Sequence, residues 1–189
     1  HAPGAQPILL DTSANASNAT GVNMPTNGSA WFNLGFIGQA ALNFDGTDSL
    51  SLGTPVVVSG DFNFKFDFKY NDGGNEIFFG RASTTNDLIR IQSSGTTLIK
   101  CGGTSTTLTL TTPLVTGTVY TIHVKRTSNT LDIVNEVGTS LVNATGTNAS
   151  DFTIYGFGNI NAGGNIFTGD LRLAEYYSDA AGTTLVHSW

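Results

Sequence analysis

Charged side chains are scarce in this chain of 189 residues. Asp, Glu, Lys and Arg together make up 12% of it, about half of the usual share near 25%. The charges that remain are mainly acidic, and the formal net charge is −6. Non-specific binding to nucleic acids or anionic membranes needs a basic surface that displaces counterions. We therefore expect neither nucleic acid nor a membrane surface as a partner.

Long apolar runs and paired cysteines are missing as well. No run approaches the about 18 apolar residues of a membrane span, so we expect no membrane insertion. Cys101 is the only cysteine, which excludes a disulfide within the chain. A chain of this length can bury a good core without one. We expect one domain over 1–189, with a flexible lead-in at 1–7, where two prolines stand in no regular pattern.

The clearest pattern that is present is GDFNFKFDFKY at 60–70, in which phenylalanine takes every second position from 62 to 68. A period of two is typical of a strand with one buried and one wet face. Each buried ring contributes roughly 1.5–3 kcal/mol relative to exposure, so a second layer has to cover them. The polar residues between the rings are expected to face solvent: Asn63, Lys65, Asp67 and Lys69.

Shorter alternating runs recur along the rest of the chain, separated by turn-forming residues. We expect hairpins at 40–52 around Asp45-Gly46, at 98–110 around Gly102-Gly103, and at 119–134 around 127–129. Further strands are predicted at 76–80, 87–92, 152–157 and 170–177. In the last of these, Leu171 and Leu173 are expected to point inward and Arg172 outward. No convincing helix is found, and the spacing is typical of an all-β, antiparallel two-sheet jelly-roll sandwich.

Five segments also follow one another in a distinctive order: LDTS at 10–13, GQAALNFDG at 38–46, GDFNF at 60–64, YTIHVKR at 120–126 and FTGDLRLAEYY at 167–177. This order resembles the concanavalin A-like jelly roll of the laminin-G and pentraxin type. The closing segment, 178–189, resembles that of such domains in bacteriophage tail fibres and other virion proteins. The resemblance implies a fold that hosts lectins, glycan-binding modules, glucanases and adhesive spacers, so it does not by itself give a function.

Catalytic patterns are not recognisable. Glucan-cleaving enzymes of this family carry two carboxylates along one strand, whereas Asp67 stands alone between lysines and 120–126 contains no carboxylate. No Ser-His-Asp spacing, phosphate loop or zinc pattern is visible. We therefore expect that the chain is not an enzyme.

A ligand-binding face is predicted from the polar positions of the strands. If the strands at 60–70, 87–92 and 119–126 share a sheet, their outward side chains line one face with the donors and acceptors that sugar hydroxyls need. Tyr177 joins them, because at least one of two adjacent tyrosines tends to point outward. The candidate ligand-binding residues are Lys65, Asp67, Arg90, His123, Lys125 and Tyr177. The alternative is an ordinary solvated surface.

Calcium is the one cofactor to consider, and none is expected to be required. Relatives of the laminin-G and pentraxin type often bind Ca²⁺ at the rim of the sandwich. In NDGGNE at 71–76, Asp72 and Asn75 are candidate metal ligands, since Ca²⁺ prefers oxygen ligands on flexible loops. DGTD at 45–48 is a second candidate. Tight turns need the same residues, which is the alternative explanation.

Three functions are compatible with these observations. The first is a carbohydrate-binding, host receptor-binding domain of a phage or viral tail fibre or spike, exposed on the virion or outside the cell. Its partner would be a host-surface glycan or polysaccharide, and tail-fibre tips suggest a homotrimer by analogy. The second is a structural or protein-contact domain that binds no sugar. The third is a glycan-cleaving enzyme with an unrecognised site.

Overall fold

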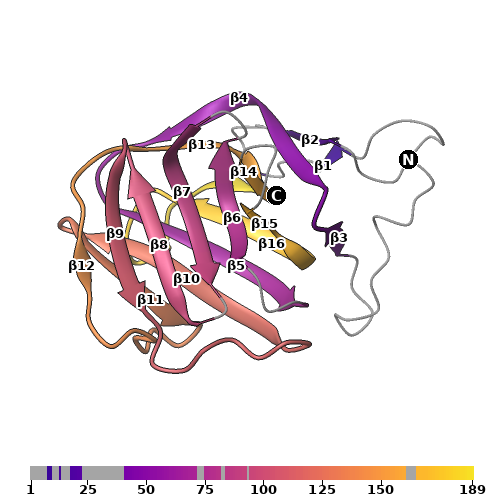
Figure 1. Ribbon diagram of the computed structural model, residues 1–189. Coiled ribbons are helices and arrows are strands. Elements are labelled where there is room, and N and C mark those ends of the chain that lie inside the picture. The colour runs from indigo at the N-terminus through magenta and orange to yellow at the C-terminus, as the bar shows by residue number, and fades with distance from the viewer. Residues whose placement is uncertain are drawn as a thin grey trace.

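The chain folds as a β-sandwich. A computed structural model describes residues 8–9, 13, 18–22, 41–71, 75–81, 84–92, 94–160 and 165–189, and the predicted lead-in at 1–7 lies outside them. Within the described residues there are strands and connections but no helix. Two antiparallel sheets pack face to face (Figure 1). The prediction of an all-β, two-sheet jelly roll is confirmed. Among the described residues, no helix has the length and apolar character needed to cross a membrane.

The larger sheet has eight strands and faces the viewer in Figure 1. Their order is β1 (Ile8–Leu9), β2 (Ala19–Val22), β4 (Ser49–Val58), β13 (Phe152–Phe157), β6 (Asn75–Arg81), β7 (Thr84–Gln92), β8 (Thr96–Cys101) and β9 (Thr104–Thr109).

The smaller sheet has seven strands and lies behind the first. Its order is β12 (Gly146–Thr147), β11 (Thr130–Asn135), β10 (Val119–Thr127), β5 (Phe62–Tyr70), β16 (Thr168–Tyr177) and β17 (Leu185–Ser188), with β3 (Leu42–Asp45) also paired to β16. A separate pair consists of β14 (Asn159–Ile160) and β15 (Asn165–Ile166).

Aromatic rings fill the space between the two sheets. The four phenylalanines of β5 are all fully buried, as their period of two predicts. The ring centroid of Phe64 lies 5.0 Å from that of Phe79, and the centroid of Phe66 lies 4.7 Å from that of Phe78. Rings from β5 therefore interlock with rings from β6 of the opposite sheet. These contacts fix the orientation of the buried side of β5.

Two of the three predicted hairpins are confirmed. β8 and β9 pair across Gly102 and Gly103, and β10 and β11 pair across Ser128 and Asn129. All four turn residues have positive φ, from 47° to 86°. Two consecutive residues with positive φ are what a tight hairpin turn matching the twist of its strands requires.

The predicted hairpin at 40–52 is wrong. β3 pairs with β16 in the seven-stranded sheet, whereas β4 pairs with β2 and β13 in the eight-stranded sheet. The turn at Gly46 exists, with a φ of 93°, but it carries the chain around a corner from one sheet to the other. Apolar residues of both strands, such as Phe44 and Leu50, then reach the same core from opposite sides.

Candidate functional site

The seven-stranded sheet turns a set of polar side chains away from the phenylalanine core. Two rows of directly paired residues cross β10, β5 and β16 on that side: His123, Lys65 and Glu175 in one row, and Lys125, Asn63 and Tyr177 in the next. We call these six residues the polar face. Asn63 is buried, and the other five are half-buried, so each keeps part of its surface open to solvent.

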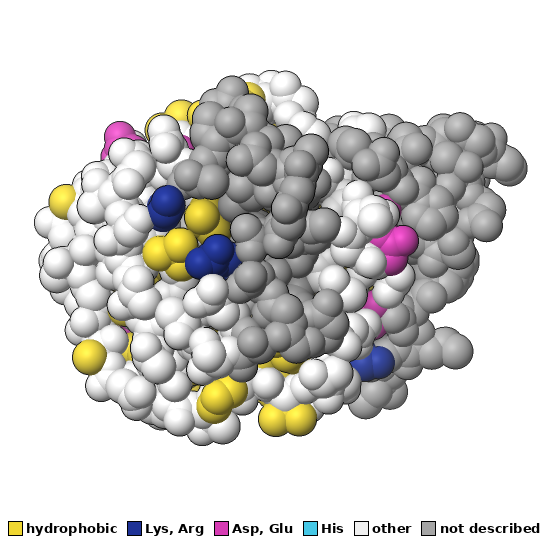
Figure 2. Space-filling view, in the orientation of Figure 1, with side chains coloured by type: hydrophobic (Ala, Val, Ile, Leu, Met, Phe, Trp, Pro, Cys, Tyr) yellow, Lys and Arg dark blue, Asp and Glu magenta, His cyan; other side chains and the backbone are white. Residues whose placement is uncertain are grey.

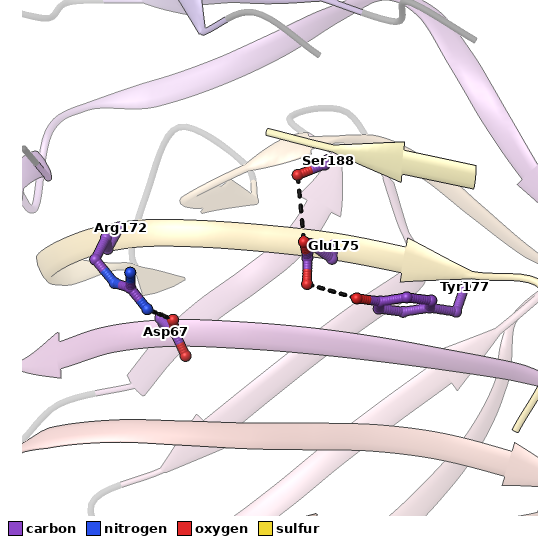
Figure 3. A network of polar contacts seen from close by, with 5 residues as sticks. All are labelled: Asp67, Arg172, Glu175, Tyr177 and Ser188. Atoms are coloured by element: carbon purple, nitrogen blue, oxygen red, sulfur yellow. Dashed lines mark hydrogen bonds and ion pairs between the residues drawn. The ribbon is translucent and has the colours of Figure 1, made fainter. Parts of the chain in front are cut away.

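Hydrogen bonds tie the polar face together at both ends. Nδ1 of His123 lies 2.9 Å from Oδ1 of Asn63. Because an amide oxygen only accepts, Nδ1 carries the proton in the neutral ring, and Nε2 is left as an acceptor. At the other end, the Tyr177 hydroxyl donates to Oε2 of Glu175 at 2.7 Å, and Ser188 Oγ donates to Oε1 at 3.4 Å (Figure 3).

Asp67 lies on the same side of the sheet but is not accessible. Its side chain is 1% exposed and forms an ion pair with Arg172, which is 32% exposed (Figure 3). The sequence-based expectation that Asp67 faces solvent is therefore wrong. The guanidinium of Arg172 compensates a carboxylate that would otherwise be costly to bury. Asp67 is a structural anchor beside the polar face in this arrangement.

A bulge in β16 decides which residues of that strand reach the polar face. Leu171 pairs with Phe68 and Leu173 pairs with the next residue, Asp67, so Arg172 is an extra residue. An inserted residue reverses the alternation that follows it. Leu173 therefore lies on the outer side, contrary to the prediction from its alternation with Leu171. The same reversal brings Glu175 onto the polar face, and sequence analysis missed this residue.

The pKa values of two residues favour uncharged forms at neutral pH. Burial, followed by the positive charge of Lys65, lowers the pKa of His123 below its ordinary value of 6.5. Burial, followed by the hydrogen bond to Glu175 and its negative charge, raises the pKa of Tyr177 to about 12. The polar face therefore presents a neutral imidazole and a phenol that keeps its proton, beside the amines of Lys65 and Lys125.

Two carboxylates also occur on neighbouring strands. Asp67 of β5 pairs with Leu173, and Glu175 follows Leu173 by two positions on β16, so both carboxylates lie on the outer side of neighbouring strands. Enzymes that cleave glycosidic bonds use such a pair, one as acid and one as base or nucleophile. A search along single strands could not find this pair, because it arises only when β16 lies beside β5.

Arg90 does not join the other predicted ligand-binding residues. It belongs to β7 of the eight-stranded sheet, so the expectation that it shares a face with Lys65 is wrong. Arg90 pairs with Leu98, and Lys100 pairs with Leu88, on the outer side of that sheet. Figure 2 shows Lys and Arg side chains beside hydrophobic ones on this face of the molecule.

The predicted calcium ligands cannot be placed. Asp72 and the side chain of Asn75 lie outside the described residues. At the alternative site, Oδ1 of Asp45 accepts hydrogen bonds from the Thr47 amide and hydroxyl, and Oδ2 of Asp48 accepts one from the Asp45 amide. These carboxylates stabilise the turn. Within the part of the chain that the structure describes, no group of three His, Cys, Asp or Glu residues is arranged to hold a metal.

Comparison with known proteins finds similar structures only. No family model matches the chain, and no curated protein matches it. A heptameric SAP-like pentraxin from Limulus polyphemus has a TM-score of 0.48 and 14% identity, over 66% of each chain. A Trypanosoma rangeli sialidase mutant that displays trans-sialidase activity has a TM-score of 0.52 and 9% identity, over 87% of this chain and 28% of that one. The enzymatically active domain of bacteriophage CBA120 tailspike protein 2 has a TM-score of 0.49 and 16% identity, over 94% of this chain and 29% of that one.

The sequence-based prediction that the chain is not an enzyme is wrong, because a missing sequence pattern does not exclude enzymatic activity. A Trypanosoma rangeli sialidase mutant that displays trans-sialidase activity is among the structures it is similar to, with a TM-score of 0.52. At an identity of 9% this likeness shows the fold alone. The chain also spans less than a third of the length of that protein.

Proposed function

We propose that this chain is a glycan-recognition domain of a phage or virion structural protein, and that the polar face is its binding surface. The observation that carries the proposal is the pair of rows in which Lys65 lies between His123 and Glu175, and Asn63 between Lys125 and Tyr177. Sugar hydroxyls both donate and accept hydrogen bonds. Ammonium donors, an imidazole acceptor and a carboxylate lie side by side on one rigid sheet and match that requirement.

We also propose where the domain acts. The resemblance of segment 178–189 to the closing segment of virion proteins supports attachment to a host-surface glycan from an exposed position on the particle or outside the cell. A homotrimer follows by analogy with tail-fibre tips. We also propose that Asp72 and Asn75 bind Ca²⁺. If calcium supports binding, EDTA will weaken glycan binding and added Ca²⁺ will restore it.

Binding to an array of neutral and acidic glycans, followed by calorimetry on the strongest ligand, tests this function. Lys65→Ala and His123→Ala should each weaken binding about tenfold, since a hydrogen bond to a charged or partly buried group contributes roughly 1.5 kcal/mol. Lys100→Ala removes a lysine of β8 in the opposite sheet and should leave affinity unchanged. A folded protein that binds no glycan would instead indicate a structural or protein-contact role. Unchanged affinity in both Lys65→Ala and His123→Ala would place the binding surface elsewhere.

Glycan cleavage is the second candidate, favoured by the two carboxylates on neighbouring strands. Glu175 is the half-buried member and can reach a ligand, whereas Asp67 is covered and paired with Arg172. Release of reducing ends from a bound polysaccharide measures this activity. We expect Glu175→Gln to abolish release while binding persists. Release that survives in Glu175→Gln would exclude this assignment, and a complete lack of release would leave recognition as the function.

A further inference from the structure

A pocket of about 250 Å³ opens at one end of the sandwich, beneath the connection 110–118 between β9 and β10. Its lining includes Ile91 of β7, Ile122 of β10 and Leu110, which are 0%, 2% and 5% exposed. Because β7 and β10 belong to different sheets, the pocket is an extension of the core between the sheets. It lies apart from the six residues of the polar face, none of which lines it.

The walls of this pocket are held by hydrogen bonds. The amide of Thr111 donates to the Leu141 carbonyl at 2.8 Å, and the amide of Gly117 donates to the Tyr70 carbonyl at 2.6 Å. The amide of Val115 donates to the hydroxyl of Tyr120 at 2.7 Å. Each bond fixes the 110–118 connection to a different strand or loop. The pocket is therefore preformed, and a ligand would not have to order the connection on binding.

The part of the lining that the structure describes is mainly apolar and carries no charge. Among the described residues no Asp, Glu, Lys, Arg or His lines the pocket, and the polar side chains come from threonines, Tyr120 and Asn135. Oδ1 of Asn135 accepts a hydrogen bond from the Thr139 amide, which orients the side chain. Val115 of the connection is 59% exposed, and Val119 just after it is 44% exposed. Figure 2 shows hydrophobic surface along the lower edge of the molecule, where the connection runs in Figure 1.

We infer that this pocket binds a small uncharged molecule with one or two rings and a single polar group. An apolar cavity of about 150 Å³ in another protein holds benzene, so a larger pocket has room for a phenol or an indole. An apolar lining with a few polar groups is the usual composition of small-molecule sites. A charged ligand would lose its hydration and find no charged partner among the described lining residues. The inference does not depend on glycan recognition.

Methyl-detected NMR titration with indole, phenol and benzoate tests the pocket. Indole and phenol should shift the methyl resonances of Ile91, Ile122 and Leu141 in a saturable way. Benzoate, which has the same ring but a negative charge, should bind at least tenfold more weakly. No saturable shift with either neutral probe, shifts confined to other methyl groups, or equal binding of benzoate would overturn the inference.

Two variants that fill the pocket give an independent measure. Leu114→Phe and Leu141→Phe each add ring volume to the lining and should weaken indole binding at least tenfold. Leu185→Phe makes the same change on β17, outside the pocket, and should bind indole like the unmodified chain. Thermal unfolding shows whether each variant is folded. If one filled variant fails to fold, the other and the benzoate comparison decide, and unchanged affinity in a folded filled variant contradicts the inference.

Discussion

The Tyr177 hydroxyl donates a hydrogen bond to Oε2 of Glu175 at 2.7 Å, from two positions further along the same strand. Residues two apart on a strand share a face, so this bond lies along the edge of the polar face. The second oxygen of Glu175 accepts from Ser188 of β17. Glu175 is therefore held by two neutral donors, and its orientation is set before any ligand arrives.

Loss of the Tyr177 proton should destabilise the fold in alkali. The pKa of Tyr177 is raised from 10.0 to about 12 in the folded chain, so the folded state holds this proton more tightly than the unfolded state. Its contribution to stability is full below pH 10 and is lost as pH rises toward 12. Absorbance at 295 nm should show a late tyrosine titration that Tyr177→Phe makes smaller, while burial also raises the pKa of Tyr176 and leaves its part of the step. Tyr155→Phe, in the opposite sheet, should leave that step in place.

The Asp67–Arg172 ion pair should respond unequally to the loss of its two partners. Arg172→Met leaves a buried carboxylate without compensation and should cost about 2–3 kcal/mol of unfolding free energy, below the usual 3–5 because Arg172 is partly solvated. Asp67→Asn removes the charge itself and should cost less. Urea unfolding of both variants and of the double variant gives the coupling energy. Equal costs, or no coupling, would show that the pair does not stabilise the fold.

Local periodicity was enough to predict the core strand and two hairpins. The phenylalanines of 62–68 alternate without interruption, and their burial follows from that alternation alone. The Gly102-Gly103 turn likewise needs positive φ, which glycine adopts at little cost. Features set by residues close in sequence could therefore be predicted.

The polar face was only partly predictable, because it depends on pairing between distant strands. Lys65, His123, Lys125 and Tyr177 were chosen correctly as outward-facing, but nothing in the sequence separates the sheet of Arg90 from theirs. The bulge at Arg172 also cannot be predicted from the alternation of Leu171 and Leu173 in the sequence. The sequence suggests an inward Leu173, and the extra residue turns it outward and brings Glu175 into the site.

Acid should weaken the fold through His123. Its pKa is lower in the folded chain than the ordinary 6.5, mainly because of burial, so the unfolded state takes up the proton first as pH falls. The contribution is fully present above pH 6.5 and is lost below it. Urea unfolding measured at pH 7.5 and pH 5.5 brackets the ordinary pKa of 6.5. Between these two pH values, His123→Gln should lose less unfolding free energy than the unmodified chain. Identical losses in the two proteins would contradict the assignment to His123.

Gly156 of β13 should not tolerate a larger side chain. A Cβ at this position would collide with the carbonyl oxygen of Leu50 on β4, where the β4–β13 register shifts between Ile154 and Gly156. Gly156→Ala should therefore cost about 1–3 kcal/mol of unfolding free energy, as overpacked sites do. Gly53→Ala is the matched control, because a Cβ there meets no atom within 4 Å, and it should change stability by less than about 0.5 kcal/mol. Chemical denaturation of both variants measures the difference, and equal stabilities would show that β4 and β13 can separate without cost.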